Sequence, residues 1–244
     1  MKRSLFGVSV PLISRETLFA HIDRGQRCMI ATLNPELMLE AYRNPSFKAT
    51  LNTMDFATVD GTGLSLILHT LGYQSPHRYP GANLLTDLIM TGHNCYFLGG
   101  LENQAKGAKE YAEHTWPSAH IVGAESGGKI DHNQLILDQN VLKRINESGA
   151  TVLLVGFGAP RQELWITAAL PHLPHIKVAV GIGGAFGFLG QKPRAPKMWR
   201  SLGLEWLYRG FYEKKHWKRI WQAVVLFPLT ALSWQLRQVL SRHG

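Results

Sequence analysis

The sequence predicts an α/β fold: a Rossmann-like, mostly parallel sheet with helices on both faces, followed by a basic and aromatic helical appendage at the C-terminal end. Short runs of apolar and β-branched residues alternate with segments whose apolar residues recur at helical spacing. Most of these runs end in Gly, Asp or Asn. Such alternation is typical of a parallel sheet that is covered on both faces. The appendage is predicted from the basic and aromatic residues that gather after residue 191.

The strand candidates, in chain order, are 28–34, 57–60, 95–100, 120–123, 151–158 and 177–184, of which 120–123 is the weakest pattern. Helix candidates between them include 101–116 and 133–148, and a helix is expected to begin near Pro35. In a sheet of this kind, ligands bind at the carboxyl ends of the strands. The Gly, Asp and Asn residues that follow the runs therefore mark the expected ligand crevice.

The composition is that of one ordinary globular domain. The chain has 244 residues, 45% of them hydrophobic and 18% charged, which is enough to form a sizeable core. No sustained apolar stretch follows Lys2 and Arg3, so we expect no cleaved secretory signal and a cytoplasmic location. Cys28 and Cys95 lie in apolar runs and are expected to be buried packing residues without a disulfide.

The net charge is unevenly distributed. Residues 192–244 hold 11 of the 26 basic side chains and 2 of the 17 acidic ones, so the whole net charge of +9 lies in this segment. An anionic partner is expected there, either phospholipid headgroups, nucleic acid or a diphosphate ligand. We therefore divide the chain into an α/β catalytic domain at 1–191 and a basic, aromatic membrane-association appendage at 192–244.

Aromatic residues are interleaved with the basic ones in this appendage, and the run 223–234 is apolar throughout. The run is about 12 residues long, shorter than the ~20 that a spanning helix needs, and Pro228 interrupts it. The pattern favours a segment that lies on the membrane surface. In the alternative interpretation, these helices pack on the core and their basic residues face water.

Glycine-rich turns follow three strand candidates, at Gly99-Gly100, at Gly156-Phe157-Gly158 and at Gly181-Ile182-Gly183-Gly184. Glycine lets the backbone approach a ligand closely, and the N–H groups at the start of a following helix suit a diphosphate. These turns favour nucleotide binding, although tight strand-to-helix turns use glycine for structural reasons as well.

Two polar residues follow strands directly. Asp60 comes before Gly61-Thr62-Gly63 and is interpreted either as a base that accepts a proton from an attacking hydroxyl or as a helix cap. Asn34 is likewise either a ligand contact or a cap for the helix near Pro35.

No metal or cofactor is expected. The histidines lack acidic or Cys partners at zinc-like spacing, and the chain contains no Asp-x-Asp pair that would hold a divalent ion against a nucleotide diphosphate. Positive side chains would have to stabilise the diphosphate instead.

Several segments together resemble the WecG/TagA/CpsF glycosyltransferases, also called glycosyltransferase family 26. They run in the family's order across nearly the whole chain. The matching stretches are Thr32-Leu33-Asn34-Pro35-Glu36, Val59-Asp60-Gly61-Thr62-Gly63, Arg78 with Gly81, Phe97-Leu98-Gly99-Gly100, Gly158-Ala159-Pro160-Arg161-Gln162-Glu163, Gly181-Ile182-Gly183-Gly184, Arg194-Ala195-Pro196-Lys197 and Leu202-Gly203-Leu204-Glu205-Trp206-Leu207-Tyr208-Arg209.

The resemblance implies a hexosyltransferase that moves a sugar from a UDP-sugar to an undecaprenyl-diphosphate-linked saccharide, in surface polysaccharide or teichoic acid synthesis. It implies that Asp60 is the general base and that the pocket is lined by Thr32, Asn34, Arg78 and Gln162, with Gly99, Gly183 and Gly184 at the glycine turns and Arg194 and Arg209 supplied by the appendage.

The implied location is the inner face of the cell membrane, where the appendage would bind anionic lipid peripherally. Nucleic acid is not an expected partner, and a homo-oligomer stays open. The chain reads Gly81-Ala82-Asn83 and Ser126-Gly127-Gly128 where the family has other patterns, so the donor sugar stays open among N-acetylmannosamine, an aminouronate and glucose.

Two other classes of function are weighed against this one. A Rossmann-like oxidoreductase would need Gly-x-Gly-x-x-Gly after a strand and an acidic residue about 20 positions on, and no strand candidate has both. A noncatalytic module that binds nucleic acid or another anionic surface through the tail would bind DNA in a salt-sensitive way.

Overall fold

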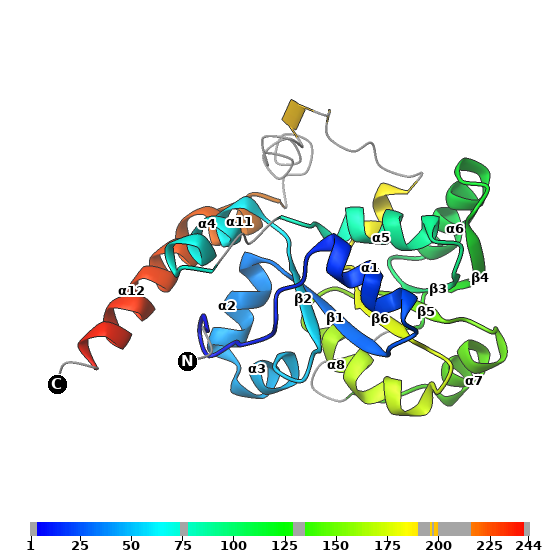
Figure 1. Ribbon diagram of the computed structural model, residues 1–244, viewed down its shortest axis with the longest axis horizontal. Coiled ribbons are helices and arrows are strands. Elements are labelled where there is room, and N and C mark those ends of the chain that lie inside the picture. The colour runs from blue at the N-terminus through cyan, green and yellow to red at the C-terminus, as the bar shows by residue number, and fades with distance from the viewer. Residues whose placement is uncertain are drawn as a thin grey trace.

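The computed structural model describes residues 4–73, 78–128, 135–189, 196, 198–199 and 216–241. Its centre is a sheet of six strands, all parallel, in the order β2-β1-β6-β5-β3-β4 (Figure 1). The α/β fold predicted from the sequence is therefore confirmed. The strands are β1 (Cys28–Leu33), β2 (Phe56–Val59), β3 (Asn94–Gly99), β4 (His120–Glu125), β5 (Val152–Gly156) and β6 (Val178–Gly181).

Helices cover both faces of the sheet. One face carries α1 (Arg15–Asp23), α5 (Gly81–Met90) and α6 (Gln104–Thr115), whose apolar residues share a core with Ile30, Leu154 and Val180. On the opposite face, α2 (Pro35–Arg43) and α3 (Pro45–Leu51) share a core with β1 and β2, and α7 (Gln139–Glu147) and α8 (Arg161–Ala169) share a core with β3, β5 and β6. The helix predicted at 133–148 begins later than expected within the described residues, because Asp138 caps α7 by accepting a hydrogen bond from the Asn140 N–H at 2.8 Å.

The central strands are buried on both faces, which explains their almost continuous apolar sequences. Cys28 and Cys95 lie in β1 and β3, where both are free thiols and fully buried. Burial raises the pKa of each thiol to about 12. Both cysteines are thus the packing residues that the sequence predicted.

The sheet has a switch point between β1 and β6. The helix that follows β1, α2, lies on one face, whereas the 3₁₀ turn η2 (Ala185–Phe188) that follows β6 packs on the other, with the Phe186 ring 4.9 Å from that of Phe97. Chains that leave neighbouring parallel strands toward opposite faces open a crevice at the carboxyl ends of those strands. The fold therefore places a crevice beside the ends of β1 and β6.

A long helix closes the described part of the chain. It consists of α11 (His216–Trp221), a π-helical turn, η3 (Gln222–Leu226), and α12 (Phe227–Leu240), and it lies along α4 (Thr62–Thr70) at one end of the molecule (Figure 1). Phe227 and Ala231 are fully buried, and the Phe227 ring meets the ring of Phe6 edge-on at 6.2 Å. One stripe of this helix therefore belongs to the core of the α/β domain.

The expectation that Pro228 interrupts this segment is wrong. The π turn brings the N–H of Phe227 to the carbonyl of Gln222, five residues back, and Pro228 then occupies the first turn of α12, where its missing N–H is tolerated. By length and composition, Arg219–Leu240 is long and apolar enough to cross a membrane. The shortness of the apolar run is thus no ground for excluding a span, whereas the burial of Phe227 and Ala231 against the domain favours a surface position. The boundary at 191/192 lies outside the described residues and stays a prediction.

Candidate active site

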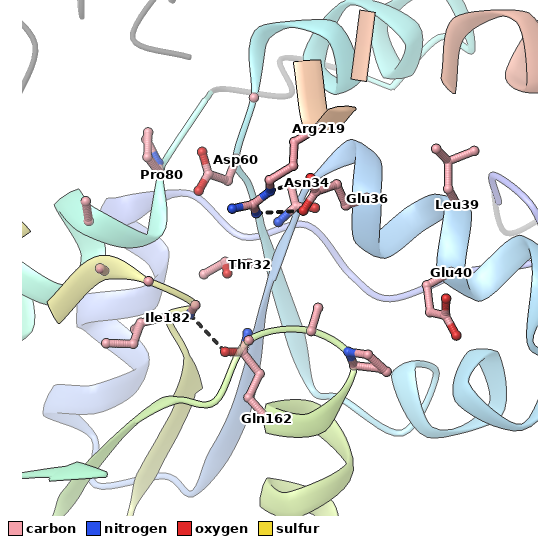
Figure 2. Close-up of a pocket in the computed structure, with 18 of the residues that line it drawn as sticks. Thr32, Asn34, Glu36, Leu39, Glu40, Asp60, Pro80, Gln162, Ile182 and Arg219 are labelled. Atoms are coloured by element: carbon pink, nitrogen blue, oxygen red, sulfur yellow. Dashed lines mark hydrogen bonds and ion pairs between the residues drawn. The ribbon is translucent and has the colours of Figure 1, made fainter. Parts of the chain in front are cut away.

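A pocket of about 710 Å³ lies at the carboxyl ends of β1, β2 and β6, where the switch point places the crevice (Figure 2). Seven of the residues predicted for the site line it: Thr32, Asn34, Asp60, Arg78, Gln162, Gly183 and Gly184. These residues come from five separate segments of the sequence. The fold therefore brings together most of the predicted site in one cavity.

Thr32 and Asn34 come from the end of β1. The Thr32 hydroxyl is buried and donates to the carbonyl of Gly181 at 2.8 Å, which ties the end of β1 to the end of β6. Asn34 caps α2, since its Oδ1 accepts a hydrogen bond from the Leu37 N–H at 2.9 Å. The cap interpretation of Asn34 is therefore confirmed, and because the same side chain lines the pocket, its amide nitrogen is the group that could donate to a ligand.

Asp60 follows β2 directly. Its backbone N–H donates to the Leu33 carbonyl at 2.6 Å, and its Oδ2 accepts a hydrogen bond from the N–H of Gly81 at 3.3 Å. The helix after Asp60, α4, is capped by Gly61 without any side-chain bond, so Asp60 is not the cap of the helix that follows it. Its carboxylate instead faces the first residue of α5, where the helix dipole favours a negative charge. A charged base held in this way can accept a proton from a hydroxyl bound in the pocket.

Arg78 lies just before α5. Its backbone forms an isolated parallel bridge with Val59 at the end of β2, and the Tyr79 N–H donates to the Val59 carbonyl at 2.8 Å. This bridge places Arg78 on the pocket wall beside Asp60. A guanidinium at this position can neutralise a phosphate group.

Gln162 and Glu163, at the start of α8, are both buried. Gln162 Oε1 accepts a hydrogen bond from the Gly183 N–H at 2.8 Å, and its Nε2 donates to Glu163 Oε1 at 2.7 Å. Burial raises the pKa of Glu163 to about 7, although the hydrogen bond from Gln162 opposes this rise. Gln162 therefore joins α8 to the glycine turn after β6.

The predicted glycines have different surroundings. A methyl group added at Gly183 or Gly184 would meet nothing within 4 Å, so both expose their backbone to open space at the pocket. Gly99 does not line the pocket. It has φ +108°, and a Cβ there would lie 2.8 Å from the carbonyl carbon of Gly156. The close approach of β3 to β5 thus accounts for Gly99 without a ligand.

Arg219 is a pocket residue that the sequence did not single out. It reaches the pocket from α11 and donates hydrogen bonds of 2.6 Å from Nε and from a terminal nitrogen to the two carboxylate oxygens of Glu36 (Figure 2). The only sequence feature that pointed to Arg219 is its position among the basic residues of the tail. The predicted residues Arg194 and Arg209 lie outside the described residues. Within the described part of the chain, no three His, Cys, Asp or Glu side chains are grouped so that they could hold a metal ion.

The chain is similar to known proteins over most of its length. The glycosyl transferase WecG/TagA/CpsF family model matches residues 3–241. A protein of Staphylococcus aureus strain MRSA252, named N-acetylglucosaminyldiphosphoundecaprenol N-acetyl-beta-D-mannosaminyltransferase, is 33% identical over 210 residues, which are 84% of this chain and 78% of the relative. Its counterpart of the same name in strain NCTC 8325 / PS 47 is 32% identical over 212 residues, with the same shares covered. The chain therefore belongs to the WecG/TagA/CpsF family of glycosyltransferases and is a hexosyltransferase.

Proposed function

We propose that this protein transfers an N-acetylmannosaminyl residue from a UDP-sugar to the N-acetylglucosaminyl group of an undecaprenyl-diphosphate-linked acceptor, in the synthesis of a surface polysaccharide or a teichoic acid. The names of the staphylococcal relatives support this sugar and this acceptor. The observation that carries the proposal is the placement of the Asp60 carboxylate and the Arg219 guanidinium on the same side of one pocket (Figure 2).

In the proposed reaction, Asp60 accepts the proton of an acceptor hydroxyl. The hydroxyl oxygen forms a bond to the anomeric carbon of the donor sugar, and the bond from that carbon to the diphosphate oxygen breaks. The nucleoside diphosphate leaves with the electron pair of the broken bond. Charge on the leaving diphosphate is balanced by Arg78 and Arg219, which come from distant parts of the sequence. The open backbone at Gly183 and Gly184 lets the donor approach the end of β6 closely.

The experiment that tests this proposal uses the purified full chain, a lipid diphosphate that carries N-acetylglucosamine, and UDP-N-acetylmannosamine, with UDP-glucose and a UDP-aminouronate as the other donors. Product is measured as a mass increase of the lipid. Transfer of N-acetylmannosamine alone is expected, and its loss in Asp60→Asn would tie it to this pocket. Transfer of glucose or an aminouronate in its place would overturn the donor assignment. No transfer from any donor would overturn the proposed reaction.

The same proposal places the protein on the inner face of the cell membrane, bound peripherally through its C-terminal helix. Beside the stripe of α12 that is buried, a second stripe of large apolar side chains faces outward: Leu229, Leu232, Leu236 and Val239. Trp221, at the end of α11, is exposed as well. A helix that is apolar on both its inner and its outer side is unfavourable in water. On a membrane surface, the outer stripe would contact acyl chains and the basic residues of the tail would contact anionic headgroups. This position would account for both the exposed apolar side chains and the positive charge of the tail.

A further inference from the structure

Glu163 is the most deeply buried carboxyl group near the pocket. Its side chain is fully enclosed, and it accepts one hydrogen bond at Oε1, from Gln162 Nε2. Its Oε2 is buried and has no hydrogen-bond partner. A buried carboxyl group with an unsatisfied oxygen is unfavourable for folding, and an apolar side chain of the same size would pack there at lower cost. Since Glu163 does not line the pocket, its contribution must come through the residue that it contacts.

That contact determines which way round the Gln162 amide lies. Glu163 Oε1 can accept a hydrogen bond, so it selects the orientation in which Nε2 faces α8 and Oε1 faces the Gly183 N–H. In the reversed amide, the NH₂ group would face the Gly183 N–H and two donors would oppose each other. There is little room for movement, because a Cβ on Gly181 would lie 2.6 Å from Gln162 Nε2.

Gly183 is the part of the pocket that this amide restrains. It has a left-handed backbone with φ +57°, and among the described residues its N–H donates to Gln162 Oε1 and to no backbone carbonyl. The neighbouring residues Ile182, Gly184 and Ala185 also line the pocket. Backbone hydrogen bonds anchor the turn on either side, from the Ile182 N–H to the Val155 carbonyl and from the Ala185 N–H to the Ile182 carbonyl. The bond that Gln162 Oε1 accepts restrains the Gly183 peptide between these anchors, so its loss frees that peptide to move.

We infer that Glu163 is a positioning residue: by fixing the Gln162 amide, it holds the Gly183 turn in the shape that receives the donor. The inference rests on the proposed function in one respect, namely that the molecule received at the turn is a sugar donor. The restraint on the turn itself does not depend on any substrate. Glu163 itself touches no reacting atom and acts through Gln162.

The test is a double-variant cycle with Glu163→Met, Gln162→Ala and the variant that carries both. Met fills a similar volume and accepts no strong hydrogen bond. We expect Glu163→Met to fold and to lower kcat/KM by roughly 10- to 100-fold, the usual cost of misplacing a group at a site, mainly through KM for the donor. If Glu163 acts through Gln162, the double variant is no worse than Gln162→Ala alone. Losses that multiply in the double variant would overturn the inference.

Hydrogen exchange of the peptide that contains Gly183 supplies a second measurement, which needs no substrate. Exchange at Gly183 should become faster in Glu163→Met and in Gln162→Ala. It should return toward the wild-type rate in Glu163→Gln, whose amide oxygen can accept from Gln162. Thr167→Val, on the same helix, is the matched control, since the Thr167 hydroxyl only donates to the Glu163 backbone carbonyl, and it should leave both measurements unchanged. Unchanged exchange at Gly183 in Glu163→Met would overturn the inference. A wild-type protein without transfer activity would refute only the proposed function and leave the exchange cycle valid.

Discussion

Arg219 donates two hydrogen bonds of 2.6 Å each to the carboxylate of Glu36, which lies 183 positions earlier in the chain. The side chains are 57% and 30% exposed, so this ion pair adds little to stability. Its importance lies in its place: it holds a cation of the C-terminal helix over a pocket whose other described lining residues, apart from Gln222, lie between residues 32 and 188.

We expect Arg219→Met to lower kcat/KM by roughly 10- to 100-fold, because it removes a cation beside the leaving diphosphate. Arg219→Lys should recover part of the loss, since an ammonium keeps the charge but cannot form the two-pronged contact with Glu36. The measurements are steady-state kinetics and UDP affinity by calorimetry. Arg237→Met, on the exposed part of α12, is the control, and an equal loss there would show that Arg219 acts only through general charge.

Asp60→Asn should lower turnover by a factor of about 10² to 10⁴, the usual contribution of a general base. Folding and UDP binding should stay close to normal, because the amide oxygen of Asn can still accept the hydrogen bond from Gly81. Single-turnover kinetics with saturating donor would separate the chemical step from binding. Near-normal turnover in this variant would remove Asp60 from the proposed role.

Transfer should persist when divalent ions are chelated, because the sequence has no Asp-x-Asp pair and arginines of the pocket can balance the diphosphate charge. The assay compares initial rates with and without EDTA. If EDTA abolishes transfer and magnesium or manganese restores it, the leaving group depends on a metal and the assignment to arginines is wrong.

Membrane binding is best tested by substitution. Deleting the tail would remove Phe227 and Ala231 and expose the part of the core that they cover. We expect Leu232→Glu with Leu236→Glu to abolish sedimentation with anionic vesicles, because both side chains face outward and acidic groups are unfavourable among acyl chains. Wild-type binding should weaken with added salt. Leu101→Glu, at an exposed leucine between β3 and α6, is the matched control. Undiminished sedimentation of the double variant would exclude α12 as the contact surface.

Glu163 should give the protein a pH-dependent stability. Its pKa is raised by burial from the ordinary 4.5 to about 7. The folded state therefore holds this proton more tightly than the unfolded state, and the associated stability is present below about pH 4.5 and is lost as the pH rises to about 7. The difference is on the order of 3 kcal/mol. In denaturant unfolding, Glu163→Gln should lack this component, so its stability relative to wild type should rise between pH 4.5 and 7.5. A constant difference would mean that the fold does not raise the pKa of Glu163.

The sheet was predictable from the sequence because its central strands are buried on both faces and read as continuous apolar runs. The same pattern pointed to Asn34 and Asp60, which each come directly after a strand, and to the glycine turn after β6, whereas Thr32, Arg78 and Gln162 were expected only from the resemblance to the family. Gly99 did not: the same turn glycine that suits a ligand also suits the close approach of β3 to β5, and only the three-dimensional contact with Gly156 separates the two.

Arg219 and Glu163 could not be assigned in advance for a different reason. The position of Arg219 depends on a contact across most of the chain, and composition reveals the charge of the tail without showing where one guanidinium lies. The prediction that Pro228 interrupts the C-terminal segment is wrong because a single π turn lets the helix continue without the N–H that Pro228 lacks. No local sequence pattern indicates such a turn.

The order in which the pocket residues occur along the chain determines when the pocket can be complete. Among the described residues that line the pocket, Arg219 and Gln222 alone come after residue 188. A chain made from its N-terminus can form the whole sheet while still on the ribosome, because domains fold as their residues emerge. Arg219, which lies in α11, is synthesised only after all six strands. Each new molecule therefore gains the side of its pocket that Arg219 supplies only after the sheet has been made.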